Sequence, residues 1–523
     1  MLRSLPFAAL AMTLPAQRLV APLTRPEASA YVTTSSAADV EAFVAALHEL
    51  PHGDRVTVRT VGASPKGRPI RLVHVAAPPG AHPRLRALVI GNIHAGEVEG
   101  KEALQVLLRE FANGEHDDLL AAVEPWFLPI YNVDGNEALG KANRPGQNGP
   151  PLCGERANGQ GLDLNRDFVK AEAPETQALL ALFAELDPHL FVDLHTTNGS
   201  YHGYQLTFAP ALSPNVDPGV ARWSRTLLDE AQASLRQQHG FATFDYGNFE
   251  TRDWDGGNAP ESPAGQRGWY TYDHRARYGI NYYGLRNRLA ILSEAYSYAD
   301  FPTRNAATRA FVLELLHGLA AHETELLATM ANADRALESG AATAFGFATR
   351  FAPPESLEVL VGQVNRVEQD GAPPRFVQMP GATPERMPVC RAFVATEHLD
   401  LPGAWAILDP SADALDRLQR HGIAVQRLAA ATKVTAARFA VTAKKKPKRP
   451  FQGHQELVLD GAWQPAAAIE LPAGTAIVDR HQRLARVAAT LLEPQSEDGL
   501  SNWNFFEATT GEFFPVLRLA ARP

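Results

Sequence analysis

Three almost continuous apolar segments, each ending in polar residues, constrain the fold of this chain more than any other feature. They read RLRALVIGN (84–92), HLFVDLHTTNG (189–199) and NRLAILSEAYSY (287–298). Segments with apolar residues at helical spacing lie between them, for example KEALQVLLREF (101–111). Strands that are buried on both faces are typical of parallel sheets covered by helices. The pattern therefore predicts an α/β fold with a mixed, mostly parallel central sheet flanked by helices.

The length of the chain and a change in its sequence pattern predict two regions. A chain of 523 residues is too long for one ordinary core, so two or more domains are expected. Strand and helix patterns alternate over residues 29–332, which we predict to form the α/β domain. Residues 346–523 indicate a smaller, β-rich α+β C-terminal module of unknown role. Within it, Asp460-Gly461 is typical of a hairpin turn, and Trp503 is expected to be a core aromatic residue.

Composition excludes several classes of protein. Hydrophobic content of 45% and charged content of 20% are typical of a globular protein, and a net charge of −9 argues against nucleic acid as a partner. No apolar run reaches the length of a membrane span. The only two cysteines, Cys153 and Cys390, lie far apart in sequence and are expected to be free. Any metal site must therefore draw on His, Asp and Glu.

The first residues resemble a secretory signal. Residues 1–16 contain an early positive charge, a short apolar stretch and a small residue, Ala16, at the expected cleavage position. This pattern predicts a periplasmic or secreted bacterial protein. If the leader is not a signal, the protein is cytoplasmic.

Two histidines and two glutamates lie where the three apolar strands end. His94 and Glu97 are three residues apart, His195 ends the second strand, and Glu294 lies in the third. The carboxyl ends of neighbouring parallel strands meet at one edge of a sheet, where ligands bind. Two histidines and one carboxylate, with a fourth position left open, are typical of a catalytic zinc site. We therefore expect His94, Glu97 and His195 to bind a single zinc ion.

A second group of polar residues follows a long loop rich in Gly, Pro and Asn. The segment GERANGQGLDLNRDF contains Arg156, Asp163, Asn165 and Arg166. Guanidinium groups bind carboxylates through two parallel hydrogen bonds, and asparagine adds further donors. A site for a substrate carboxylate is one interpretation, and ion pairs at the protein surface are the other.

Taken together, these motifs resemble the carboxypeptidase A-like zinc metallocarboxypeptidases, or funnelins. The marks of the resemblance are HAGE, RANGQGLDLNRDF, DLHTT and LSEAYS, in the order and spacing of the family, together with VGASPKGRPI and YNVDGNE. The resemblance covers about residues 30–330 and is closer to large bacterial members with an additional C-terminal region than to digestive enzymes. It implies the metallocarboxypeptidase fold and a catalytic domain over 29–332.

The resemblance also implies roles for individual residues. His94, Glu97 and His195 would bind zinc, in agreement with their positions at the strand ends. Glu294 would be the general base that takes a proton from water and passes it to the leaving amine. Arg156 would stabilise the oxyanion that forms during cleavage.

The remaining implied roles concern substrate and support. Asn165 and Arg166 would bind the free α-carboxylate of the substrate, and Asp163 would orient His94. The tyrosine that covers the substrate terminus in the family has no clear counterpart here. Tyr272 lies at about the family's spacing from the catalytic glutamate, and Arg286 is a further candidate for the specificity pocket.

The sequence therefore predicts a zinc-dependent exopeptidase that releases C-terminal residues from peptides or peptide-like substrates. A zinc amidase or deacylase that cleaves N-acyl amino acids or cell-wall peptides on the same scaffold is the alternative. A zinc-containing binding protein without turnover is a third possibility, although such a protein has no need of Glu294. Side-chain preference and oligomeric state stay open.

Overall fold

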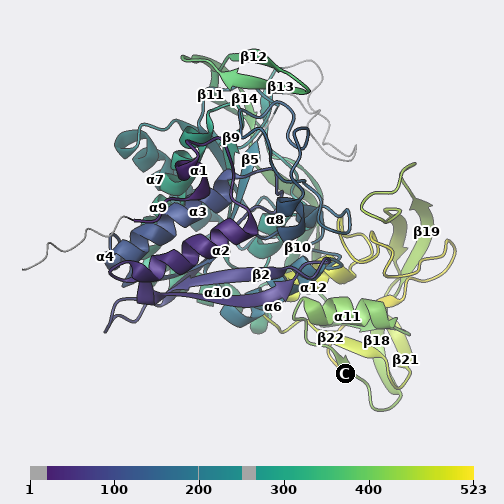
Figure 1. Cartoon of the computed structure of the whole chain (residues 1–523). Helices are drawn as coiled ribbons and strands as arrows, with labels where there is room; N and C mark the ends of the chain where they lie inside the picture. The colour runs from purple at the N-terminus through teal and green to yellow at the C-terminus, as the bar shows by residue number, and fades with distance from the viewer. Residues whose placement is uncertain (1–20, 198, 250–266) are drawn as a thin grey trace, which may run out of the picture.

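A computed structural model describes residues 21–197, 199–249 and 267–523 of the chain. The predicted signal at residues 1–16 lies outside the described residues. In the described part of the chain, no helix is long and apolar enough to cross a membrane. Figure 1 shows an α/β body to which the C-terminal strands are added at two places: β11 to β14 at one end, and β18, β21 and β22 at the other.

A mixed eight-stranded sheet forms the centre of the molecule. Its strands, in spatial order, are β1 (Val56–Ala63), β2 (Pro69–Val75), β4 (Val123–Leu128), β3 (Leu85–Gly91), β5 (Leu190–Thr197), β9 (Leu289–Tyr296), β6 (Leu206–Pro210) and β7 (Thr243–Asp245). The four central strands, β4, β3, β5 and β9, run parallel to one another, and antiparallel pairs lie at the margins. The prediction of a mixed, mostly parallel central sheet is confirmed.

Helices cover both faces of this sheet. The main ones are α2 (Ala37–Ala46), α3 (Glu99–Asn113), α6 (Pro174–Leu186), α7 (Pro218–Gln238), α8 (Gly279–Gly284), α9 (Phe301–Ala321) and α10 (Glu323–Glu338). On β5, the ring of Phe191 contacts Phe183 of α6, whereas Leu194 lies against Gly100 of α3. Residues three apart on a strand point to opposite faces, so α6 and α3 cover opposite sides. This arrangement explains why β3, β5 and β9 are almost continuously apolar.

Local sequence explains where several helices begin. Ser36 accepts a hydrogen bond from the Asp39 backbone amide at 3.1 Å, and the Asp39 carboxylate accepts one from the Ser36 amide at 2.9 Å. This capping box starts α2. Asp300 caps α9 by accepting a hydrogen bond from the Thr303 amide, and Pro302 lies in the first turn, where its missing N–H costs nothing.

The region after α10 is rich in β-structure, as predicted. Its strands are β10 (Ala344–Phe351), β11 (Glu355–Val361), β12 (Val364–Gln369), β13 (Ala372–Gln378), β14 (Thr383–Cys390), β15 (Phe393–Asp400), β16 (Ala404–Ile407), β17 (Gln426–Arg427), β18 (Thr432–Ala437), β19 (Phe439–Lys445), β20 (Val458–Trp463), β21 (Ala467–Leu471), β22 (Ala476–Asp479) and β23 (Val516–Leu519). Two helices accompany them, α11 (Ala412–Arg420) and α12 (Ala485–Leu492). The strands pair mostly as antiparallel neighbours, and the largest group is a six-stranded sheet built around β16.

The predicted turn at Asp460-Gly461 is wrong. Both residues lie inside β20, which pairs with β19 across a shift in register between Val441 and Ala443. A Cβ atom at position 461 would lie 2.3 Å from the Ala440 carbonyl oxygen. Gly461 therefore allows β19 and β20 to approach closely at a bulge, which is a common role of glycine within a strand.

The two regions share a core. Strand β14 pairs in parallel with β8 (Trp269–Tyr270), which belongs to the α/β part of the chain. One cluster of buried apolar side chains includes Phe168 and Tyr282 together with Trp503. Trp503 is fully buried, so the prediction of a core position for this residue is confirmed. The cysteines, Cys153 and Cys390, are free, as expected.

Candidate metal centre and substrate cavity

The predicted metal ligands and Glu294 come from the carboxyl ends of three adjacent parallel strands. His94 and Glu97 lie between β3 and α3, while His195 and Glu294 lie on β5 and β9. His195 and Glu294 are direct partners in the register of these two strands. Side chains far apart in sequence are therefore brought to one sheet edge by strand pairing alone.

Two glycines allow the connection that carries His94 and Glu97 to turn tightly. A Cβ atom at Gly91 would lie 3.0 Å from the backbone carbonyl carbon of Gly100. A Cβ atom at Gly100 would lie 2.8 Å from the Cβ of Leu194. The end of β3 and the start of α3 therefore cross in close contact, which only residues without a side chain permit.

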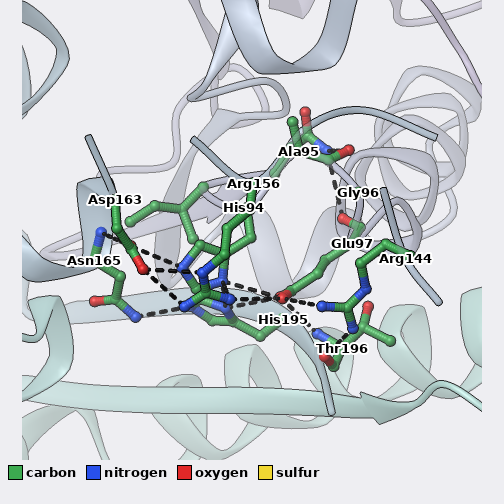
Figure 2. Close-up of polar contacts among 12 residues, drawn as sticks. His94, Ala95, Gly96, Glu97, Arg144, Arg156, Asp163, Asn165, His195 and Thr196 are labelled. Atoms are coloured by element: carbon green, nitrogen blue, oxygen red, sulfur yellow. Dashed lines mark hydrogen bonds and ion pairs between the residues drawn. The ribbon is translucent and has the colours of Figure 1, made fainter. Parts of the chain in front are cut away.

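His94, Glu97 and His195 form a compact buried cluster, as Figure 2 shows. Their ligand atoms all lie within 4.8 Å of one another. The two Nδ1 atoms are 3.2 Å apart, and Glu97 places Oε1 3.1 Å from the Nδ1 of His94 and Oε2 3.0 Å from that of His195. Two ligands held about 2.0–2.1 Å from a tetrahedral ion are separated by about 3.3 Å. The spacing therefore fits the binding of a single metal ion.

Each imidazole is held from behind by a carboxylate. The Nε2 of His94 lies 3.1 Å from Asp163 Oδ1, and the Nε2 of His195 lies 2.8 Å from Asp193 Oδ2. When Nε2 carries the proton and shares it with the carboxylate, Nδ1 keeps the lone pair that a metal requires. Asp163 occupies the position predicted for it. Asp193 was missed by the sequence reasoning, although it lies two residues before His195 and so on the same face of β5.

The third ligand candidate, Glu97, is surrounded by donors. Its carboxylate accepts hydrogen bonds from the Arg144 guanidinium at 2.9 Å and from the Thr196 backbone amide at 3.0 Å. Burial alone would raise the pKa of Glu97, but His94, Arg144 and a hydrogen bond from His195 hold it well below its usual range. Glu97 is therefore a carboxylate at neutral pH, the form in which it can bind a metal.

Arg144 was also missed by the sequence reasoning. It lies in the Gly-, Pro- and Asn-rich loop, and its guanidinium also donates to the Thr196 carbonyl at 2.8 Å. The unusual length of this loop was the available signal, because long loops in compact domains are usually functional. The signal pointed to the loop but not to the residue within it.

The metal cluster opens into a cavity of about 350 Å³. Arg156, Asn165, Arg166, Tyr272 and Glu294 all contribute to its lining. Most of the predicted site is therefore gathered around one space, with the metal ligands at one wall.

Two of the arginines that line the cavity, Arg156 and Arg166, are supported differently. The Nε of Arg156 donates to Asp163 Oδ2 at 2.9 Å, and its side chain is 39% exposed, so its outer end is accessible to a ligand. Arg166 is buried, with its guanidinium 4.2 Å from the ring centre of Tyr278. The charge of Arg166, that of Arg156 and the neighbouring His94 outweigh burial and hold the pKa of Asp163 well below its usual range.

Glu294 lies on the cavity wall next to the metal cluster. Burial raises the pKa of Glu294 to about 8; His195 opposes this shift and the negative charge of Glu97 adds to it. Leu292, two residues earlier on the same face of β9, also lines the cavity. A carboxyl group in such surroundings can gain and lose a proton near neutral pH.

Tyr272 lies in an aromatic part of the cavity wall. Its ring packs edge-on against Tyr246 and Tyr278, with centroid distances of 5.7 and 5.5 Å. This position is compatible with the predicted contact to substrate, which stays a prediction.

Arg286 does not line this cavity, so its predicted role in the specificity pocket is corrected. Its guanidinium is buried, and it donates to the Tyr282 hydroxyl at 3.2 Å and to the His421 carbonyl at 3.3 Å. The residue follows α8 and faces the C-terminal region. Sequence distance from Glu294 could not reveal this, because the partner is 135 residues away in the chain.

Comparisons with known proteins relate part of this chain to one family. Residues 40–288 match the model of the zinc carboxypeptidase family. Carboxypeptidase 2 of Trichophyton equinum is 23% identical over 460 residues, which cover 84% of this chain and 77% of the relative. Carboxypeptidase E of Caenorhabditis elegans is 33% identical over 147 residues, or 25% of this chain and 30% of the relative.

Two of the solved structures with similarity to this chain carry the name metallo-carboxypeptidase. The metallo-carboxypeptidase from Burkholderia cenocepacia superimposes with a TM-score of 0.41 and 17% identity, covering 55% of this chain and 70% of that structure. The metallo-carboxypeptidase from Pseudomonas aeruginosa in complex with (2-guanidinoethylmercapto)succinic acid gives a TM-score of 0.40 and 20% identity, covering 56% and 70%. The family match over residues 40–288 identifies a zinc carboxypeptidase domain in this part of the chain and supports a hydrolase of the metallopeptidase kind.

Proposed function

We propose that this protein is a zinc-dependent carboxypeptidase that releases C-terminal residues from peptides or peptide-like substrates. The observation that carries the proposal is the convergence of two Nδ1 atoms and the Glu97 carboxylate, within 4.8 Å of one another, at one wall of the cavity. Bound there, zinc would polarise a substrate carbonyl and lower the pKa of a water molecule.

The binding groups for the substrate terminus are Asn165 and Arg166. Both line the cavity, and Arg166 is fixed against the ring of Tyr278. A buried guanidinium next to an amide favours a carboxylate ligand over an uncharged one, since burial strengthens the charge–charge interaction. This is the reason for an exopeptidase rather than an enzyme that cuts within a chain.

Two further groups act on the scissile bond. Glu294, with its raised pKa, would accept a proton from the attacking water and deliver it to the leaving amine. Arg156 reaches the cavity from its anchor on Asp163, and its exposed end would stabilise the negative charge that develops on the carbonyl oxygen. One carboxyl group suffices for both proton transfers because it becomes an acid once it has acted as a base.

The test combines metal analysis with mass spectrometry of a digested peptide mixture. We expect about one zinc per chain and the loss of single residues from free C-termini, while peptides with amidated C-termini stay intact. Release of an acyl group from N-acyl amino acids, with intact peptides unchanged, would instead favour the amidase or deacylase alternative. Bound zinc with no cleavage of either class would favour a binding protein.

The variant Glu294→Gln separates chemistry from metal binding. We expect turnover to fall by about 10²- to 10⁴-fold, the usual contribution of a general acid–base group, with zinc content unchanged. The matched control is Glu185→Gln, the same chemical change at an exposed residue of α6 that pairs with Arg59. Unchanged turnover in Glu294→Gln would remove this residue from the mechanism.

A further inference from the structure

The C-terminal region holds the segment that carries the substrate-binding and metal-supporting residues. Contacts from residues 420–503 reach residues 163–172 at five points. The pairs are Gln452 with the Asp163 amide (2.9 Å), His421 with the Val169 carbonyl (3.0 Å), Lys170 with the Trp503 ring (4.9 Å), Arg420 with the Ala171 carbonyl (2.7 Å) and His454 with the Glu172 carboxylate (3.0 Å). The segment 163–172 is thus fixed along its length by residues that follow it by more than 200 positions.

One of these contacts reaches directly behind the metal cluster. The Asp163 amide donates to the side-chain oxygen Oε1 of Gln452. The carboxylate of the same aspartate lies 3.1 Å from the Nε2 of His94 and accepts a hydrogen bond from the Nε of Arg156 at 2.9 Å. A single residue of the C-terminal region therefore anchors the aspartate that contacts both His94 and Arg156.

The backbone conformation of Gln452 is unusual for a glutamine. Phe451 and His454 exchange two backbone hydrogen bonds, of 2.8 and 3.0 Å, around a two-residue turn. Its central residues, Gln452 and Gly453, have φ angles of 48° and 81°. Such turns strongly favour Asn, Asp or Gly at the first position, because longer side chains are strained in the left-handed region. A strained residue that persists at a turn points to a role for its side chain.

We propose that Gln452 is a positioning residue of the metal centre. Through the amide of Asp163 it holds the carboxylate that sets the orientation of His94, and thereby the direction of the Nδ1 lone pair. The C-terminal region therefore contributes to the geometry of the metal centre and is not a module without a role in the site. The effect on catalytic activity rests on the proposed function. The effect on zinc affinity can be measured whether or not the protein is a carboxypeptidase.

The experiment compares Gln452→Gly with the wild-type full-length chain. Glycine removes the side-chain acceptor and relieves the left-handed backbone, so the melting temperature of the apoprotein should not fall. The zinc dissociation constant, measured by competition with a chromogenic chelator, should rise roughly 3- to 10-fold. This is less than the 10- to 100-fold typical of a direct partner of a ligand, since Gln452 acts through Asp163. We expect kcat/KM to fall by a similar factor.

Two further variants make the test specific. Gln455→Gly changes a glutamine three residues away, whose side chain donates to the Pro447 carbonyl within the C-terminal region. Its zinc affinity should stay within about twofold of wild type. In an Asp163→Ala background, Gln452→Gly should weaken zinc binding no further, because coupled residues are not additive.

The outcomes separate the two proposals. The positioning role is overturned if the zinc affinity of Gln452→Gly lies within twofold of wild type. It is also overturned if Gln455→Gly loses as much zinc affinity as Gln452→Gly. Full additivity of the effects of Gln452→Gly and Asp163→Ala on zinc affinity would overturn it as well. If the wild-type protein binds zinc but cleaves no peptide, the proposed function fails, while the chelator experiment still decides the role of Gln452.

Discussion

The α/β region and the C-terminal region contribute to the site in different ways. Every lining residue identified in the described part of the cavity lies between His94 and Glu294, in the α/β region. The C-terminal region approaches the same elements from behind, through Gln452, His421 and Trp503. The groups placed to act on a substrate therefore come from the α/β region, and the segment 163–172, which carries several of them, is held in part by the other region.

This division has a physical reason. Groups that meet substrate must be mobile or exposed on one side, and Arg156 has a side chain that is 39% exposed. Their geometry must still be held to within a fraction of an ångström, which requires buried contacts from a second layer. In this protein that layer includes residues far along the chain. Substitutions in the two regions should accordingly affect different properties of the protein.

The largest effect is expected for loss of a metal ligand in the α/β region. His195→Ala removes one of the three proposed ligands, so zinc affinity should fall by about 10³-fold or more and turnover should be lost, with the fold retained. Zinc content after dialysis and the thermal melt of the apoprotein check this. Retention of stoichiometric zinc after dialysis would show that His195 is not a ligand.

The second prediction concerns the core of the C-terminal region. Trp503 is fully buried, and its indole nitrogen donates to Asp498 at 2.9 Å. Trp503→Ala should lower the free energy of unfolding by about 3–5 kcal/mol, the usual cost of removing a large buried aromatic ring. Because Trp503 belongs to a core that both regions share, calorimetry should show one transition that shifts as a whole.

Two separate transitions, with only one of them shifted by Trp503→Ala, would contradict a common core. Phe513→Ala is a suitable control for this experiment, because Phe513 is 44% exposed and its removal should cost far less.

A third, smaller effect is expected behind the metal cluster. Asp193→Asn preserves the size of the side chain but removes the charge that faces the Nε2 of His195 at 2.8 Å. Zinc affinity should fall by about 10- to 100-fold, less than for loss of the ligand itself. Chelator competition measures this change. An affinity equal to that of wild type would show that Asp193 does not orient His195.

The smallest effect is a pH dependence at the contact between the regions. His421 is buried, with the Tyr282 hydroxyl 2.8 Å from Nδ1 and the Val169 carbonyl 3.0 Å from Nε2. Burial lowers the pKa of His421 to about 4; the Val169 carbonyl opposes the shift, and nearby arginines add to it. A neutral ring satisfies both contacts, since Nε2–H donates and Nδ1 accepts.

The sign of the effect follows from this lowered pKa. The stabilising contribution of neutral His421 is present above about pH 6.5 and is lost as the pH falls from there toward 4. At pH 5 the loss amounts to about 2 kcal/mol. The difference in unfolding free energy between pH 7 and pH 5 should therefore shrink by about that amount in His421→Gln, as denaturant titration can measure. An identical pH dependence in both proteins would exclude this role.

Much of the fold and of the site could be predicted because the signals were local. Apolar runs on β3, β5 and β9 indicated buried parallel strands, and polar residues at their ends indicated a ligand site at one edge. His94, Glu97, His195 and Glu294 were all placed in this way, since pairing of adjacent parallel strands leaves little freedom in where their ends meet.

What the sequence could not reveal were contacts between distant segments. Arg144 reaches Glu97 across 47 positions, Arg286 turns toward His421 across 135, and Gln452 reaches Asp163 across 289. Asp460-Gly461 has the composition of a turn, but pairing with β19 places it in a strand. Periodicity and motif spacing report what a residue does among its near neighbours along the chain. The packing of the C-terminal region against residues 163–172 decides which side chains support the site, because these contacts exist only once the two segments fold together.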